Sequence, residues 1–407
     1  MSTTAPDLPI SEAAAAAPES MPTIAIAFPG DPLHPATWSG TPSGVARGLQ
    51  VAGATVRGLQ AEPRRTVNAA AMHVLSLARL HRSDRSEGLI EALRKSRRSA
   101  RLSPELGRLQ TRAVRGRLQA LGPVDGIVQI GTGYALPDGV PFVTFEDMTV
   151  AQVLEAPYPG WSGLPRKAIQ RRIDTQRRVY ERADACCTTT HWVADSVVND
   201  YGISREKVHV VGVGRNHEPA LVDRDWSVPR FLFVGIEWQR KNGDGVLRAF
   251  ARLRHEIPQA RLDLVGGHPP VAQDGVTAHG VLRLGVPEDK ALLKDLYAAA
   301  TCFVMPSHQE ASALAYTEAG AAGIPSIGST VGGSAELIGD GGLVVDPSDD
   351  DALLEAMRTL ADPATAARLG DIAQVHARNF TWPAVGERLL RAIAPAGVDV
   401  ARLAPFL

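Results

Sequence analysis

Two glutamates eight positions apart, Glu310 and Glu318, form the most informative pattern in the sequence. An apolar run at 301–305 predicts a strand, Glu310 follows it in a turn, and an Ala-rich helical pattern begins near Ser312. The amino-terminal end of a helix presents free N–H groups and a positive dipole end, which suit a phosphate. Glu318, about two helical turns further on, can accept hydrogen bonds from neighbouring hydroxyls. The pattern indicates a sugar nucleotide held by its pyrophosphate. The alternative is an amphipathic helix beside an unrelated loop glutamate.

Arg240 and Lys241 supply positive charge after a second apolar run, 230–234. Cleavage of a sugar–diphosphate bond builds negative charge on the departing phosphate, which a metal or fixed cations and amides must offset. No Asp-x-Asp pair lies in a loop suited to a metal, so no metal site is expected. We expect Arg240 to bind as a fork and Lys241 as a point charge. The alternative is an exposed pair in a turn. The expected helix adds the amides of Ser312, Ala313 and Leu314.

Short apolar runs alternate with helical patterns along the chain, which predicts parallel strands joined by helical crossovers. We therefore predict an α/β protein with two doubly wound, Rossmann-like domains that face each other across a cleft, with ligands at the carboxyl ends of the strands. The expected divisions are a disordered tail at 1–21, a first domain at 22–215, a connection at 216–229, a second domain at 230–390 and a segment at 391–407 that packs back on the first domain.

The individual elements follow from the same alternation. Strands are expected at 23–28, 126–130, 142–145, 185–189 and 208–213, and then at 230–234, 260–265, 301–305, 326–328 and 343–345. Helices are expected at 43–52, 67–80, 86–98, 104–120, 167–182 and 192–200, and then at 244–256, 287–299, 312–322, 349–360 and 363–377.

Three residues of the first half are candidates for the same cleft. Gly40 and Thr41 lie in a turn where the missing side-chain bulk of glycine permits close contact with phosphates bound to the other domain. Asp147 follows a predicted strand and is expected to orient the acceptor hydroxyl or sugar. The alternative for Asp147 is a helix N-cap ahead of the segment 149–154.

The composition is that of a globular enzyme rather than of a secreted or membrane-spanning protein. The 407 residues carry a formal net charge of −1, with 44% hydrophobic and 21% charged residues, which is ordinary for a globular enzyme. The three cysteines show neither a metal-ligand spacing nor a disulfide framework, so a reducing cytoplasm is expected. The first 21 residues lack the features of a signal peptide, and no window has the roughly 18 apolar residues of a membrane-spanning helix.

The segment 64–117 is strongly basic, with 14 Lys or Arg residues against 4 Asp or Glu. One interpretation is a cationic helical face that makes weak peripheral contact with a membrane or binds an anionic acceptor. The other is a solvated helix surface. Aromatic residues are not interleaved with these cations, which argues against a nucleic-acid groove.

Several segments resemble, in order, the motifs of the family 4 retaining glycosyltransferases, which have the GT-B fold. The resemblance covers about 23–393 and is most specific after Phe231. The segments that carry it are the glycine-then-basic loop at 233–242, the strand-end glycine pair Gly266-Gly267, the two-glutamate motif with Met305-Pro306-Ser307, and the lead-in to the last helix at 379–382.

The sequence departs from the family pattern at three places. Ala311-Ser312-Ala313 stands where the family usually has a small, an aromatic and a glycine residue. Ile236 occupies a position where arginine is common, so the resemblance leaves Arg240 to supply the guanidinium. Asp147 occupies a position where many relatives have histidine. These changes put the identity of the donor sugar in doubt.

The resemblance implies a retaining bacterial hexosyltransferase that needs neither a metal nor a cofactor. The donor would be a hexose linked to UDP or GDP, with UDP slightly favoured, and the donor phosphate would help to deprotonate the acceptor hydroxyl. Glu310 would contact the donor sugar and Glu318 would bind the ribose. Gly266, in the strand-end glycine pair of the donor domain, would also contribute to substrate binding. A small molecule or glycan is the expected acceptor, and no nucleic acid is expected. The sequence leaves the oligomeric state undetermined.

Two other functions remain open. One is an NDP-sugar epimerase of the same fold, and the other is an inactive relative that binds a sugar nucleotide without turnover.

Overall fold

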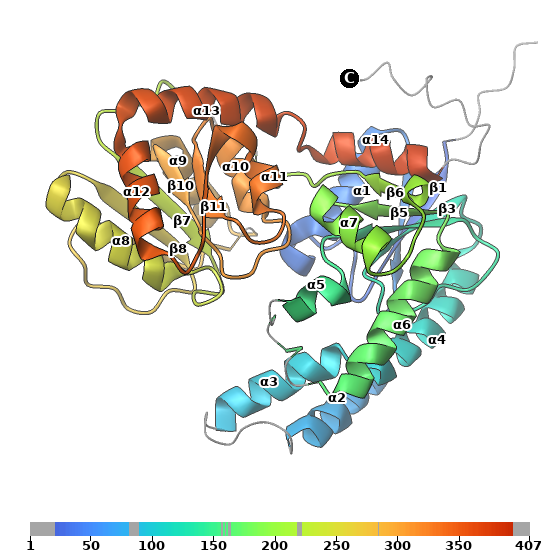
Figure 1. Ribbon diagram of the computed structural model, residues 1–407. Helices are drawn as coiled ribbons and strands as arrows, with labels where there is room; N and C mark the ends of the chain where they lie inside the picture. The colour runs from blue at the N-terminus through green and yellow to red at the C-terminus, as the bar shows by residue number, and fades with distance from the viewer. Residues whose placement is uncertain are drawn as a thin grey trace, which may run out of the picture.

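The computed structural model describes residues 21–80, 89–155, 158, 160–161, 164–217, 222–283 and 285–393. Each half of the chain forms a parallel sheet of six strands covered by helices, and the two halves lie side by side (Figure 1). The two sheets confirm the predicted pair of doubly wound domains. The expected tail and most of the expected segment 391–407 lie outside the described residues.

The first sheet has the strand order β2-β1-β3-β4-β5-β6. Its central strands are buried on both faces because helices cover the sheet on both sides. The strands are β1 (Thr23–Phe28), β2 (Thr55–Gln60), β3 (Gly126–Ile130), β4 (Phe142–Glu146), β5 (Ala185–Thr188) and β6 (Val208–Val210). The helices are α1 (Thr41–Val51), α2 (Arg65–Leu80), α3 (Leu89–Arg101), α4 (Pro104–Leu121), α5 (Val150–Glu155), α6 (Arg166–Arg182) and α7 (His191–Asn199).

The second sheet has the strand order β12-β11-β10-β7-β8-β9. Its strands are β7 (Arg230–Gly235), β8 (Arg261–Gly266), β9 (Val276–Gly280), β10 (Cys302–Val304), β11 (Ser326–Ser329) and β12 (Gly342–Val345). The helices are α8 (Gly243–Glu256), α9 (Pro287–Ala299), α10 (Leu314–Ala321), α11 (Ser334–Ile338), α12 (Asp350–Ala361), α13 (Pro363–Ala377) and α14 (Trp382–Ile393).

The sequence prediction missed two strands, β2 and β9. Each lies at an edge of its sheet, and each is only partly buried. An edge strand needs no continuous apolar run, because solvent reaches one side of it. Polar residues such as Arg57 and His279 therefore break the pattern that marked the buried strands.

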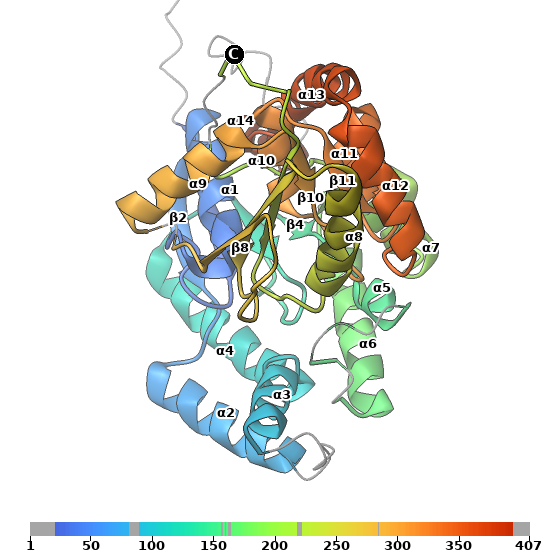
Figure 2. The same ribbon diagram turned by 90° about the vertical axis from the view of Figure 1, so that its left-hand side faces the viewer.

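Helix α14 leaves the second domain and lies on the first, at the end opposite to α2 and α3 (Figures 1 and 2). The segment that packs back on the first domain therefore begins at Trp382. The sequence predicts a later start for it, at residue 391. Helix α14 crosses α1 where Gly48 faces Gly386, and a Cβ atom on Gly48 would overlap the backbone of Trp382. The absence of side chains at this crossing lets the two helix backbones touch.

Residues of the two domains also meet directly. The Thr189 and Ser312 hydroxyls are 2.6 Å apart. The backbone N–H of His191, at the start of α7, donates a 2.7 Å hydrogen bond to the Glu336 carboxylate on α11. Within the described ranges, no helix combines the length and apolar character needed to cross a membrane.

We predict that Gly48→Ala destabilises the protein by about 1–3 kcal/mol, because the new methyl group must push the two helices apart. Gly116→Ala on α4 is the matched control, because a Cβ atom there meets no other atom within 4 Å. The control is expected to be stabilising by about 0.5–1 kcal/mol, as alanine favours a helix. Denaturant unfolding measures both changes, and equal effects at the two positions would contradict the close crossing.

Candidate active site

The candidate site lies where the carboxyl ends of β4, β7 and β10 face each other across the two domains. Asp147 follows β4, the loop after β7 carries Arg240 and Lys241, and Glu310 follows β10. The guanidinium of Arg240 lies 5.1 Å from the centre of the Tyr158 ring, which belongs to the first domain. The structure therefore brings four of the predicted residues into one region.

Glu310 is a buried carboxylate surrounded by donors. It forms an ion pair with the ammonium group of Lys241, and it accepts hydrogen bonds from the Ser307 hydroxyl at 3.1 Å and the Ala311 N–H at 3.2 Å. The Arg240 Nη1 atom is 3.7 Å from the same carboxylate. Burial opposes ionisation, but Lys241 and Arg240 together hold the pKa of Glu310 below its ordinary value. Glu310 is therefore negatively charged at neutral pH.

Arg240 is held in position by three partners. Its Nε donates to the carboxylate of Glu237, its Nη1 donates to the Gln309 carbonyl at 2.8 Å, and its plane lies near the Tyr158 ring. These contacts orient the guanidinium toward the turn that carries Glu310. Arg98 of α3, in the first domain, lies 3.9 Å from the carboxylate of Glu237. The loop after β7 therefore contacts residues of both domains.

The helix expected from Ser312 begins later, at Leu314. Ala313 has extended backbone angles (φ −72°, ψ 116°), which place it before the first helical turn. Ser312 lies in the turn and contacts Thr189. The candidate phosphate-binding amides of Ser312, Ala313 and Leu314 thus lie in a turn and at a helix start rather than within one helix.

Asp147 is coupled to this cluster across the cleft. Burial raises its pKa to about 7, and the negative charge of Glu310 adds to the rise while Arg240 opposes it. A carboxyl group with this pKa exists in both protonation states near neutral pH, so it can donate or accept a hydrogen bond. The alternative helix-cap role is not what the structure records, because α5 begins at Val150 and its preceding residue Thr149 bonds to Gln152.

Glu146 is a further buried carboxyl group that the sequence analysis missed. It ends β4 directly before Asp147, and its Oε1 atom has no hydrogen-bond partner among the described residues. Burial, and then the charge of Asp147, raises its pKa to about 8. Two adjacent acidic residues at the end of an otherwise apolar strand were the available signal.

Glu318 is buried on α10, and its hydrogen-bond partners are different from those of Glu310. It accepts hydrogen bonds from the backbone N–H of Asn216 at 3.3 Å and from the Tyr297 hydroxyl at 3.2 Å. Burial raises its pKa to about 7. Glu318 also lines a cavity of about 290 Å³ together with His217 and Lys290, among other residues.

The predicted glycines serve packing in this structure. Gly40 lies against the Asn216 side chain, whose Nδ2 donates to the Ser39 carbonyl at 2.6 Å. Thr41 is buried at the start of α1. Gly266 has φ +126°, and a Cβ atom there would overlap the carbonyl of Gly235 on the neighbouring strand. Only glycine combines that backbone angle with that close approach.

The turn before α1 has an unusual backbone. Trp38 and Ser39 have φ values of 43° and 55°, which non-glycine residues rarely adopt, and Gly40 continues the left-handed run. The Trp38 ring stacks on Phe28 at a centroid distance of 5.7 Å. Strained backbone of this kind persists where surrounding contacts enforce it, and it is often found at functional sites.

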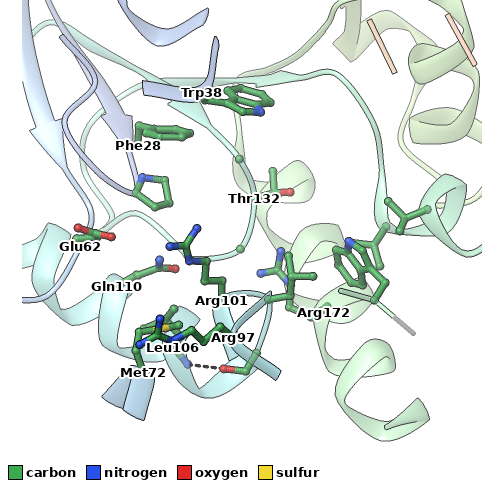
Figure 3. A pocket seen from close by; sticks show the side chains of 18 of the residues that line it. Phe28, Trp38, Glu62, Met72, Arg97, Arg101, Leu106, Gln110, Thr132 and Arg172 are labelled. Carbon is green, nitrogen blue, oxygen red and sulfur yellow. Dashed lines mark hydrogen bonds between the residues drawn. The ribbon is translucent and has the colours of Figure 1, made fainter. Parts of the chain in front are cut away.

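A cavity of about 1000 Å³ opens in the first domain beside Asp147 and Glu146 (Figure 3). Trp38 and Phe28 line it from above (Figure 3), and residues of α2, α3, α4, α5 and α6 and of the loops after β3 and β4 line much of the rest. Among the described residues, no three His, Cys, Asp or Glu side chains gather in a way that could hold a metal ion.

We predict that Glu146→Gln removes a pH-dependent loss of stability. The native state keeps a proton on Glu146 that the unfolded chain releases above its ordinary pKa of 4.5, so stability falls as the pH rises from 4.5 to about 8. The free energy of unfolding of the variant, relative to the wild type, should therefore rise across this range and stay constant below it. Urea unfolding at several pH values measures this difference. The same change at the exposed Glu181 is the control, and parallel pH curves for wild type and Glu146→Gln would contradict the assignment.

Comparisons with known proteins address the second domain most directly. A family model described as "Glycosyl transferases group 1" matches residues 228–362. The D-inositol 3-phosphate glycosyltransferase 1 of Catenulispora acidiphila is 32% identical over 295 residues, which cover 64% of this chain and 68% of the relative. The D-inositol 3-phosphate glycosyltransferase of Streptomyces avermitilis is 33% identical over 241 residues, or 52% of each chain. The chain spans about half the length of curated relatives such as this one.

A solved structure extends the similarity to both domains. Sucrose-phosphate synthase from Thermosynechococcus elongatus superposes with a TM-score of 0.63 at 20% identity, covering 91% of this chain and 98% of that chain. At this identity the likeness establishes a shared fold and nothing further.

Proposed function

The chain belongs to the group 1 glycosyl transferases, as its motifs predicted, and we propose that it transfers a hexose from a nucleoside diphosphate to an acceptor hydroxyl. The observation that carries the proposal is the cluster of Glu310, Lys241 and Arg240 on one domain, with Asp147 facing it from the other. Such a site holds cations for a leaving diphosphate on one side and a carboxyl group for an acceptor on the other.

Lys241 and Arg240 would offset the charge that develops on the departing diphosphate. Both cations are fixed by contacts that exist without the substrate, so little reorganisation is required when the bond breaks. The free amides at the start of α10 would add their dipoles. This supply of positive charge supports a reaction that needs no metal, and we propose no cofactor.

Glu310 would bind the donor sugar and stabilise positive charge at its anomeric carbon, because it is ionised and buried. Asp147 would orient the acceptor hydroxyl. We propose that the reaction retains the anomeric configuration, with an oxygen of the donor phosphate taking the acceptor proton on the face where the leaving group departs.

UDP or GDP is the proposed donor nucleotide, and Glu318 its ribose ligand. The names of the relatives favour a small hydroxylated acceptor. The cavity beside Asp147 favours transfer over epimerisation, because an epimerase has no second substrate to accommodate. We also propose a cytoplasmic location, which the three unpaired cysteines support, and weak peripheral membrane contact through 64–117.

A thermal-shift screen tests nucleotide binding first. We expect one of the UDP, GDP, ADP or TDP sugars to raise the melting temperature, since a ligand at about 100 times its dissociation constant contributes about 2.7 kcal/mol. If no nucleoside diphosphate or its sugar shifts the unfolding of well-folded protein, the proposed donor class is wrong.

We predict that Lys241→Met lowers kcat by about 10²–10³, because one fixed cation at the leaving group is lost while the aliphatic stem remains. The control is Arg252→Gln, which removes an exposed cation paired with Asp351 and should leave kcat unchanged. Release of nucleoside diphosphate measures turnover. Equal rates for wild type and Lys241→Met would rule out this role.

Two further readouts address the mechanism. Activity is expected to be undiminished by EDTA, since the proposed charge stabilisation comes from side chains and amides. The anomeric proton coupling of the product, measured by NMR, should match that of the donor. Loss of activity with the chelator would overturn the metal-independent step, and an inverted product would overturn retention.

A further inference from the structure

The cavity beside Asp147 has a cationic wall. Arg97 and Arg101 lie four residues apart on α3, so their side chains emerge on the same face of the helix. Arg172 reaches the cavity from α6, and all three side chains point into it (Figure 3). Neither Arg97 nor Arg101 forms a hydrogen bond or an ion pair with any described residue, so no acidic partner neutralises its charge.

Arg172 is the innermost of these cations. Its guanidinium lies 5.8 Å from the Trp161 ring, and its buried Nε atom has no hydrogen-bond partner in the described part of the chain. The charge of Glu146 acts on it, and one oxygen of that carboxyl group also lacks a hydrogen-bond partner among the described residues. Buried polar atoms without partners are rare, because their loss of hydration is otherwise uncompensated. The pair therefore faces a space that a polar ligand would fill.

The same cavity also has an apolar lining, much of it from α2 and α4. The apolar side chains that line it are Met72 and Leu77 of α2, Leu93 of α3, Leu102 just after α3, and Leu106 of α4. Leu77 and Leu93 remain 52% and 40% exposed, so the apolar wall continues to the mouth. A soluble protein seldom leaves aliphatic side chains exposed beside a cavity without a ligand or partner for them.

We propose that the acceptor is an amphipathic anion, with a phosphate-type group held by Arg97, Arg101 and Arg172 and an apolar portion against α2 and α4. The proposal rests on the proposed function and names the substrate class of the same site. Guanidinium groups suit a phosphate because their N–H groups form paired hydrogen bonds to its oxygens.

The acidic residues of the cavity do not cancel this charge. Asp147 interacts with Glu310 and Arg240 of the second domain, and Glu62 lies on the wall opposite Arg172 (Figure 3). Glu146 is buried beside Asp147, where burial favours its neutral form. Three guanidinium groups therefore supply the positive charge of the cavity wall, with Arg172 as the least exposed of them.

Binding of hexyl phosphate to the full chain, measured by calorimetry, tests the proposal against two partial ligands. Inorganic phosphate carries the charge alone, and hexyl glucoside carries the apolar chain alone. We expect hexyl phosphate to bind at least tenfold more tightly than either. Equal affinity for hexyl phosphate and inorganic phosphate would overturn the apolar part, and equal affinity for hexyl phosphate and hexyl glucoside would overturn the anionic part.

Arg101→Gln and Arg97→Gln should each weaken hexyl phosphate binding about tenfold or more, since each removes a charged hydrogen-bond donor. Hexyl glucoside binding should not change. Arg94→Gln is the matched control on the same helix, because Arg94 is exposed, pairs with Glu91 and does not line the cavity. Wild-type affinity in both cavity variants would overturn the assignment.

Two further measurements distinguish the acceptor proposal from the proposed function and from binding to a lipid surface. Nucleotide-induced thermal shifts should be the same in Arg101→Gln and wild type. If the proposed function is wrong, neither protein shows such a shift. If only the acceptor site is wrong, the nucleotide shifts remain and the expected differences in hexyl phosphate binding are absent. Vesicles containing an anionic phospholipid form the second arm. If Arg101→Gln loses vesicle binding but keeps hexyl phosphate binding, these cations meet a lipid surface and the acceptor assignment is wrong.

Discussion

A carboxylate buried at the end of a parallel strand is stable only if its charge is offset, and Glu310 meets this requirement through Lys241. Removing one partner of such a pair leaves an uncompensated buried charge, which costs about 3–5 kcal/mol. The loop after β7 and the turn after β10 are therefore tied to each other by electrostatics as well as by the sheet. Arg240 strengthens the tie through the Gln309 carbonyl. Arg240 and Lys241 are thereby held beside Glu310.

The first domain contributes groups of a different kind. Glu146 and Asp147 are buried, and burial raises their pKa values although the charges of Arg172 and Arg240 oppose the rise. One domain thus holds a charged cluster, at which we propose that a diphosphate binds, while the other holds weakly acidic groups beside a large cavity. The contacts of Thr189 with Ser312 and of His191 with Glu336 keep the two surfaces facing each other.

Sequence reasoning predicted the parts of this arrangement that are local along the chain. Buried central strands such as β3 and β4 appear as apolar runs, and Glu310, Arg240 and Lys241 each follow such a run within a few residues. The edge strands β2 and β9 lack that signal because one side of each meets solvent. The meeting of Arg101 with Arg172 in one cavity depends on how α3 and α6 pack, and no spacing along the chain encodes it.

Asn216 connects three structural regions through one short side chain and its own backbone. Its amide binds the Ser39 carbonyl in the left-handed turn and accepts from the indole of Trp382 at 3.0 Å, while its N–H reaches Glu318 on the second domain. Of these bonds, the one to Glu318 reaches the second domain, so rotation of one domain against the other would strain that bond. Because the same residue donates to the Ser39 carbonyl directly before α1, a displacement of Glu318 would act on that turn through Asn216.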